Sequence, residues 1–163
     1  MASGNTLLTF VAEEGRPTLT NGATFDTRNN IGCFDFDDTT AESLVFTGVL
    51  PRNYGGGGIT VYLHWAATSA TSGTGGWTVA FERIGDGQQD IDADGFASAQ
   101  TVTAATVPAT SGHVKSTNVA VSNGANMDSI AVGEMFRLKV TRDVANDTAT
   151  GDLELYAVEL KET

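Results

Sequence analysis

Hydrophobic and polar residues alternate along many short segments of this chain. The clearest segment is ITVYLHW at 59–65, in which every second residue is a large apolar one. The same alternation recurs in WTVAF at 77–81 and in FRLKVTR at 136–142. A period of two residues is typical of a β-strand with one buried face. We therefore expect Trp65 to point into a core and His64 to point away from it.

Further strands are expected where apolar and β-branched residues cluster between turn-forming residues. These segments are 5–12, 23–28, 32–37, 43–50, 99–107, 114–122 and 152–160. The connectors between them are rich in Gly, Ser, Thr, Asn and Asp, and only 126–135 could form a helical turn. The sequence thus predicts an all-β fold of eight to ten strands. We expect one domain over 1–163, a two-sheet antiparallel sandwich of jelly-roll type.

The segment LELYAVEL, residues 153–160, does not follow the simple alternation. Leu153 and Leu155 lie on one face of an ideal strand, whereas Val158 and Leu160 lie on the other. Both faces are therefore expected to be apolar. Such a strand is either central and covered on both sides, or covered by another subunit.

The balance of charge narrows the range of partners. Nine Lys and Arg residues stand against 20 Asp and Glu residues, which gives a net charge of −11. An acidic surface repels nucleic-acid phosphates and anionic lipids, so neither nucleic acid nor a membrane is an expected partner. The first ten residues lack a basic and apolar signal-peptide pattern, and no run approaches about 18 apolar residues. We expect a protein that is made and used without secretion.

The run Gly55 to Gly58 precedes the strand that starts at Ile59. A phosphate-binding loop of the P-loop type needs a Lys and a Ser or Thr that open a helix, and here a strand follows instead. The run is therefore interpreted as a flexible connector between two strands.

The segment DIDADG at 90–95 is the best candidate for metal binding. Asp90, Asp92, Asp94 and Gly95 reproduce the first half of an EF-hand calcium loop. The twelfth position of that loop, which needs a Glu, is Thr101. We interpret the segment as a solvated acidic turn, with calcium binding as the open alternative.

No catalytic residue, cofactor site or metal site is assigned from the sequence. Asp35 and Asp37 are expected to share the polar face of a strand, and Cys33, the single cysteine, to be a small buried residue. Neither His64 nor His113 has a neighbour at a spacing typical of a catalytic triad. The protein is therefore not expected to be an enzyme.

Exposed aromatic residues could instead form a platform for sugars. Trp65 and Trp77 take the core phase of their strands, which leaves Tyr54 and Tyr62 as the candidates.

The order of parts over 34–87 resembles small structural proteins of tailed bacteriophages. An Asp-rich strand is followed by TAES at 40–43, by PRNY at 51–54 with its glycines, and by two strands that carry Trp. The segments VGEMFRLKVTRD and GDLELYAVEL continue the pattern. The resemblance implies a jelly-roll virion protein assembled in the host cytoplasm. In the first interpretation it is a decoration or cement protein that binds the outer capsid surface as trimers and stabilises the lattice.

Under this resemblance the partners are the major capsid protein or another virion protein, together with further copies of the chain. Two alternatives stay open, namely a phage tail or fibre component and a β-sandwich glycan-binding module.

The expected burial of Trp65 and Trp77 yields a first prediction, on stability. Replacing Trp65 or Trp77 by Ala should lower the free energy of unfolding by about 3–5 kcal/mol, because a large core side chain is lost. Urea unfolding followed by circular dichroism measures this loss. An unchanged stability together with loss of a binding activity would contradict the core assignment.

Overall fold

The computed structural model describes residues 4–163, so the first three residues of the segment inspected for a signal peptide lie outside it. Over residues 4–163 the chain forms eleven strands and two short 3-10 helices. The strands are β1 (Thr6–Val11), β2 (Arg16–Pro17), β3 (Thr24–Arg28), β4 (Ile31–Phe36), β5 (Ser43–Val49), β6 (Ile59–Ala67), β7 (Thr74–Ile84), β8 (Gln100–Thr106), β9 (Lys115–Val121), β10 (Met135–Arg142) and β11 (Leu153–Glu162). The 3-10 helices are η1 (Ala12–Glu14) and η2 (Ala125–Met127), and no helix of the described residues is long and apolar enough to cross a membrane.

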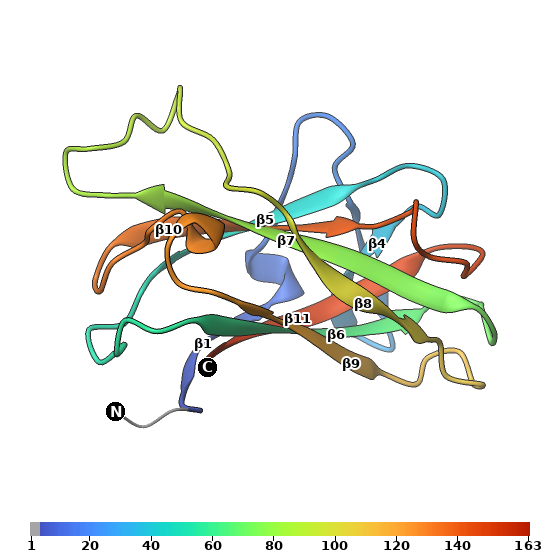
Figure 1. Cartoon of the computed structure of the whole chain (residues 1–163). Coiled ribbons are helices and arrows are strands. Elements are labelled where there is room, and N and C mark those ends of the chain that lie inside the picture. Colours follow the sequence, from blue (N-terminus) through green and yellow to red (C-terminus); the bar gives the residue numbers. More distant parts are fainter. Residues whose placement is uncertain (1–3) are drawn as a thin grey trace.

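Two antiparallel sheets lie face to face (Figure 1). The six-stranded sheet has the order β3-β4-β11-β6-β9, with β1 alongside β11, and the five-stranded sheet has the order β2-β5-β10-β7-β8. The predicted jelly-roll sandwich is confirmed. All ten predicted strands are present, and the eleventh is the two-residue β2, which is too short to produce a periodic pattern.

The core lies between the two sheets and is built from the apolar phase of each strand. Trp65 and Trp77 are fully buried, and their ring centroids lie 6.1 Å apart. The Trp65 indole N–H donates to Thr117 Oγ1 at 3.0 Å, whereas the Trp77 indole nitrogen is buried without a hydrogen-bond partner among the described residues. Phe36 packs edge-on against Trp77 at 4.9 Å. The alternation in the sequence therefore gave the correct phase for both tryptophans.

Strand β11 contains a β-bulge that explains its irregular pattern. Leu155 pairs with Trp65 and Ala157 pairs with His64, so one extra residue, Tyr156, is inserted between them. The bulge shifts the phase by one residue, and Val158 returns to the core face that Leu155 occupies. The prediction that both faces of this strand are apolar is therefore wrong.

The prediction that Asp37 lies on the same strand face as Asp35 is also wrong. Strand β4 ends at Phe36, and Asp37 lies in the following turn. Its Oδ1 accepts hydrogen bonds from the backbone N–H groups of Thr39 and Thr40, both at 2.7 Å. Asp forms such turns readily, because its short side chain reaches the backbone two residues on.

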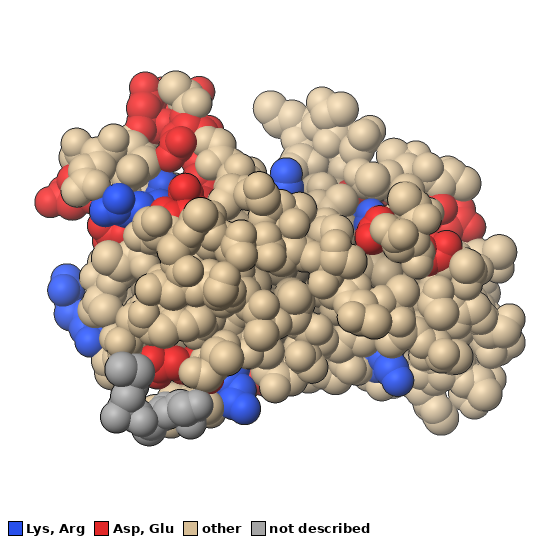
Figure 2. Space-filling model, in the orientation of Figure 1, with Lys and Arg blue, Asp and Glu red and all other residues tan. Residues whose placement is uncertain are grey.

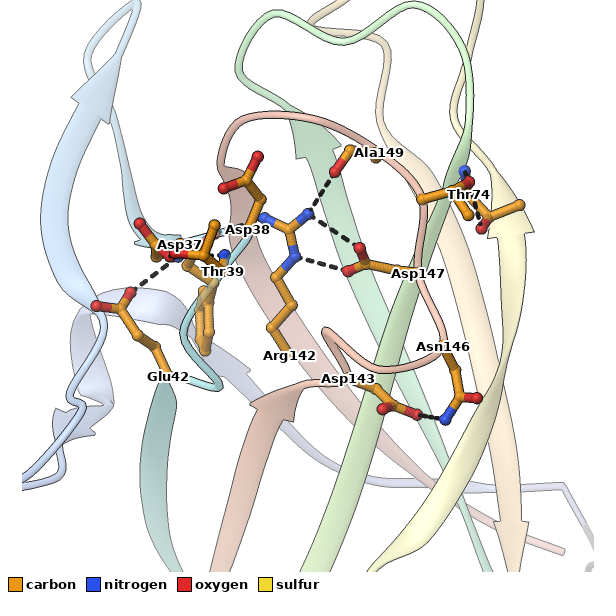
Figure 3. A network of polar contacts seen from close by, with 12 residues as sticks. Asp37, Asp38, Thr39, Glu42, Thr74, Arg142, Asp143, Asn146, Asp147 and Ala149 are labelled. Carbon is orange, nitrogen blue, oxygen red and sulfur yellow. Dashed lines mark hydrogen bonds and ion pairs between the residues drawn. The ribbon is translucent and has the colours of Figure 1, made fainter.

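A buried arginine joins the two sheets at the end of β10 (Figure 3). The Arg142 side chain is fully buried, and its Nε donates to Asp147 at 2.7 Å. Its remaining nitrogens donate to the carbonyl oxygens of Phe36, Ala149 and Gly151 at 2.8–2.9 Å. The guanidinium therefore connects the five-stranded sheet to β4 and closes the loop that leads into β11.

This buried pair yields a stability prediction. Asp147→Ala should lower the free energy of unfolding by about 3–5 kcal/mol, because it leaves the Arg142 charge buried without its carboxylate. Urea unfolding measures the difference.

The matched control is Asp143→Ala, in the same loop, where the carboxylate accepts, among residues 4–163, a hydrogen bond only from the side chain of the exposed Asn146. This control should cost about 0.5 kcal/mol or less. Equal losses in the two variants would contradict the role assigned to Asp147.

Candidate functional site

A pocket of about 490 Å³ lies where the β3–β4 turn, the β8–β9 loop and strand β11 meet. We call it the Tyr156 pocket. Its lining residues are Arg28, Asn29, Ile31, Ser111, Gly112, His113, Val114 and Tyr156. They come from three separate stretches of the chain, so the pocket exists only in the folded protein.

The β3–β4 turn places the first of these residues. Arg28 and Ile31 form the last pair of the ladder, and the two residues between them, Asn29 and Asn30, have φ angles of 50° and 64°. Two consecutive residues with positive φ are typical of a type I′ hairpin turn, and Asn tolerates this conformation better than most residues. A two-residue turn has no slack, so the position of Asn29 is fixed by the sheet.

The β8–β9 loop approaches this turn closely at a glycine. Gly112 has a φ of +86°, and a Cβ atom at this position would lie 2.9 Å from Arg28 Nη2. A side chain at position 112 would therefore displace the guanidinium. His113 follows directly, and its backbone N–H donates to Thr110 O at 3.2 Å. Glycine thus allows the loop to rest against Arg28 and hold His113 at the pocket.

The β-bulge places the third contribution, Tyr156, on the outer face of the sheet. Its hydroxyl donates to Glu154 Oε2 at 2.7 Å, and Arg28 Nη1 donates to the same oxygen at 2.8 Å. Arg28 Nη1 also donates to Ala67 O at 3.1 Å. The hydrogen bond to Glu154 raises the pKa of Arg28, and burial raises the pKa of the Tyr156 hydroxyl. Both groups therefore keep their protons and their positions at neutral pH.

A group of three potential metal ligands lies beside this pair. Ligand atoms of Cys33, Asp35 and Glu154 lie within 4.8 Å of one another, and Asp35 is directly opposite Glu154 in the ladder. A thiol and two carboxylates are ligands that zinc accepts. Glu154 Oε2, however, already accepts two hydrogen bonds, so we assign no metal to the group.

The same group perturbs the titration of its members. Burial and the nearby Asp26 and Glu154 charges raise the pKa of Asp35 to about 6, and Oδ1 of Asp35 has no hydrogen-bond partner among residues 4–163. Burial and Glu154 raise the pKa of the Cys33 thiol to about 12. Cys33 is thus buried as expected, although it lies on the face that carries Asp35 rather than in the core between the sheets.

The pocket combines apolar surface with hydrogen-bonding groups. Ile31 and Val114 are each 57% exposed at its rim, whereas Asn29, Ser111 and His113 supply donors and acceptors. Within the described part of the chain, no hydrogen bond joins Ser111 to His113. The arrangement suits binding of a ligand that has both apolar faces and hydroxyl groups, and it lacks an activated nucleophile.

The two histidines, to which the sequence assigns no distinct roles, lie in different parts of the structure. His113 lines the Tyr156 pocket, whereas His64 lies on the outer face of β6, between Ala157 and Ser116 of the neighbouring strands.

The two tyrosines that the sequence suggests for sugar binding differ in their exposure. Tyr62 is partly exposed on the outer face, but Tyr54 is 4% exposed and its hydroxyl donates to Gly57 O. Tyr54 is therefore a core residue, and its prediction as an exposed aromatic is wrong.

The glycine run and the acidic segment both lie in loops. Gly55 to Gly58 belong to the connector between β5 and β6, as expected from the sequence. The carboxylates of Asp90, Asp92 and Asp94 are not among the potential metal-ligand groups of residues 4–163. Asp90 Oδ1 instead accepts the backbone N–H of Asp92 at 2.9 Å, so this carboxylate closes its own turn.

Sequence reasoning missed Arg28, Asn29, Gly112 and Tyr156. Two signals in the sequence could have indicated them. Asn29 and Asn30 stand between two strand segments, which is typical of a type I′ turn. The broken alternation of 153–160 is the mark of a bulge, and bulges often lie next to functional sites.

No family model matches the sequence, and no curated protein matches it. Solved structures match the fold. A CBM35 domain from Cellvibrio japonicus is 10% identical with a TM-score of 0.54, and the match covers 94% of this chain and 91% of that domain. The CBM22-1 xylan-binding domain from Paenibacillus barcinonensis is 11% identical with a TM-score of 0.51, covering 99% of this chain and 97% of that domain.

An exo-β-1,3-galactanase from Phanerochaete chrysosporium, solved with galactose, matches with 14% identity and a TM-score of 0.52. The match covers 98% of this chain but only 29% of the galactanase. At these identities the comparisons show a shared jelly-roll sandwich fold.

The perturbed Asp35 carboxyl yields a prediction on pH. Its ordinary pKa is 3.8 and its folded pKa is about 6, so the folded state binds more protons between these values and loses stability as the pH rises through them. Asp35→Asn removes this loss. The variant should be more stable than the native protein above about pH 6, and the gain should shrink as the pH falls to about 4.

Thermal unfolding at a series of pH values measures this gain. The control is Asp90→Asn in the exposed acidic loop, which should show no such pH-dependent gain. A gain for Asp35→Asn that does not change with pH would contradict the raised pKa.

Proposed function

We propose that the chain is a non-catalytic glycan-binding module whose ligand site is the Tyr156 pocket. The observation that carries the proposal is the junction of exposed apolar side chains, Ile31 and Val114, with hydrogen-bonding groups on loops held in place by the sheet. Ligand sites are typically concave, partly apolar and equipped with a few fixed polar groups.

The chemistry of the pocket suits a sugar ring. A pyranose presents hydroxyl groups around its rim and apolar C–H groups on its faces. Asn29 and Ser111 can both donate to and accept from hydroxyl groups, as can a neutral His113. The rim residues Ile31 and Val114 and the ring of Tyr156 offer apolar surface for the C–H faces.

The pocket is also well ordered before any ligand arrives. Arg28 is held by Glu154 and Ala67, Tyr156 is held by Glu154, and Asn29 is fixed in a two-residue turn. A site that needs little ordering on binding loses less conformational entropy, so even a few hydrogen bonds give measurable affinity.

The fold comparisons support the same proposal. The CBM35 and CBM22-1 domains match along almost their whole lengths, and the second is described as xylan-binding. A fold does not by itself determine a function, so the similarity of fold supports the proposal only in combination with the chemistry of the pocket.

The resemblance to tailed-phage structural proteins gives a location for such a module. A glycan-binding domain on a virion appendage would satisfy both the resemblance and the pocket chemistry. The capsid-decoration role, the trimer and the capsid partner stay predictions from the sequence pattern.

The proposal is tested by a glycan microarray followed by calorimetry with the best-bound neutral glycan. Asn29→Gly removes the amide but preserves the positive φ of the turn. This variant and His113→Ala should each weaken binding about 2–12-fold, the value of one hydrogen bond, without lowering the melting temperature.

Matched controls are Asn53→Gly, in the exposed β5–β6 connector, and His64→Ala, on the outer face of β6. Both should leave the affinity unchanged. Absence of binding to any glycan, or equal losses in pocket and control variants, would refute the proposal.

A further inference from the structure

The outer face of the five-stranded sheet carries a second pocket, of about 470 Å³, that we call the cationic trough. We propose that this trough binds a glycan segment that bears carboxylate groups, such as a polyuronate. The inference extends the proposed function to a second site and a second class of sugar, and it does not depend on the Tyr156 pocket.

The sheet register brings three cations to one face. Arg16 of β2 and Lys139 of β10 both pair with Val45 of β5, and Arg137 of β10 pairs with Thr47 of β5. Directly paired residues share a face of the sheet. The neighbours of Val45, Leu44 and Phe46, are fully buried in the core, so this set points outward. Three of the nine Lys and Arg residues of the chain therefore lie together.

Two loops border this face. Figure 2 shows a hollow between two lobes at the top of the view. In Figure 1 these lobes correspond to the β7–β8 loop and to the loop between β2 and β3. The pocket lined by Arg16, Thr18, Leu19, Val45, Thr47 and Arg137 lies on the β2–β3 side. Phe96 of the β7–β8 loop packs on the other side against Arg137 and Lys139.

Contacts within the protein hold the Arg137 guanidinium in place. Its Nε donates to Glu82 Oε2 at 2.5 Å, and Glu82 is fully buried. The ring of Phe96 lies 4.9 Å from the Arg137 guanidinium carbon and 4.7 Å from Lys139 Nζ. Such cation–π contacts order both side chains without cancelling their charge.

The trough has a local excess of positive charge on an acidic protein. Among residues 4–163, Arg137 has one acidic partner, Glu82, whereas Arg16 and Lys139 form no ion pair. Within the described part of the chain, Arg16 donates only to backbone carbonyls, that of Gly15 at 3.0 Å and that of Glu13. The set therefore carries three positive charges against the one negative charge of Glu82. The β7–β8 loop on the other border carries the exposed Asp86, Asp90, Asp92 and Asp94, so an anionic ligand is favoured on the β2–β3 side of this face (Figure 2).

The chemistry points to carboxylates on a sugar chain. Guanidinium groups bind carboxylates in planar, charge-assisted hydrogen bonds. Strands β2 and β10 flank β5, so their cations lie on strands about 10 Å apart, which favours a polymer with repeated carboxylates over a single small anion. The Thr47 hydroxyl can donate and accept, the Thr18 hydroxyl, which donates to Thr20 O at 2.9 Å, can still accept, and the exposed Leu19 offers apolar surface for the sugar faces.

The experiment is calorimetry with an oligogalacturonide, which carries a carboxylate on every sugar, and with a neutral galactan as comparison. The test variant is Arg16→Gln combined with Lys139→Gln, because neither residue has an acidic partner among residues 4–163 that would be left buried without its cation. The double variant should bind the oligogalacturonide at least about 10-fold more weakly, and raising the salt from about 0.05 M to about 0.5 M should weaken native binding strongly.

The matched control is Lys115→Gln combined with Lys161→Gln, which makes the same change in net charge on the other sheet. This control should alter the affinity by less than about 2-fold. Equal losses in both double variants would show that only overall charge matters and would overturn the proposal, as would absence of oligogalacturonide binding.

Self-association of the native protein that the Arg16/Lys139 variant abolishes would identify a second copy as the occupant and would also overturn the proposal. Sedimentation velocity measures this property. The proposals for the two sites can be refuted independently of each other. Oligogalacturonide binding that survives Asn29→Gly, with no neutral glycan bound, would support the trough and refute the function proposed for the Tyr156 pocket.

Discussion

The arrangement of the site depends on the buried guanidinium of Arg142. A charge in a fully buried position is tolerated only when each donor finds an acceptor, and here Asp147 and three backbone carbonyls fill that role. These acceptors lie on β4 and in the loop between β10 and β11. The guanidinium therefore fixes the distance between the two sheets at this end of the molecule and the point at which β11 begins.

The residue at which β11 begins determines where Glu154 lies, and Glu154 holds the other polar side chains of the Tyr156 pocket. Glu154 is the second residue of that strand and receives the hydrogen bonds of both Arg28 and Tyr156. The bulge at Tyr156 lets the strand keep Leu155 and Val158 in the core and still turn a tyrosine outward. One inserted residue thus satisfies the packing of the core and the placement of a polar site on the opposite face.

Much of the fold could be predicted from the sequence, because half-buried strands alternate with a period of two. Trp65 and Trp77 were placed correctly for this reason. The broken alternation of β11 was interpreted as two apolar faces, because a single inserted residue leaves a pattern that fits a bulge and a doubly apolar strand alike. The turn at Asp37 was missed because Asp also occurs on the polar face of a strand, and only its bonds to Thr39 and Thr40 separate the two cases.

Less of the site than of the fold could be predicted from the sequence. Arg28, His113 and Tyr156 lie far apart along the chain, and the sheet register brings them together. The same holds for Arg16 and Lys139, which become neighbours only because both pair with Val45. The motifs that stood out in the sequence, the glycine run and the DIDADG segment, lie in loops and line neither pocket, although the DIDADG segment belongs to the loop that borders the trough.

The central claim is that a neutral glycan binds at the Tyr156 pocket. A titration of the isotopically labelled protein with such a glycan, followed by backbone amide chemical shifts, tests it most directly. The account predicts that the largest shifts lie at 28–31, at 111–114 and at Tyr156. Shifts confined to the β5–β6 connector or to 90–95, or no shifts with any neutral glycan, would contradict it.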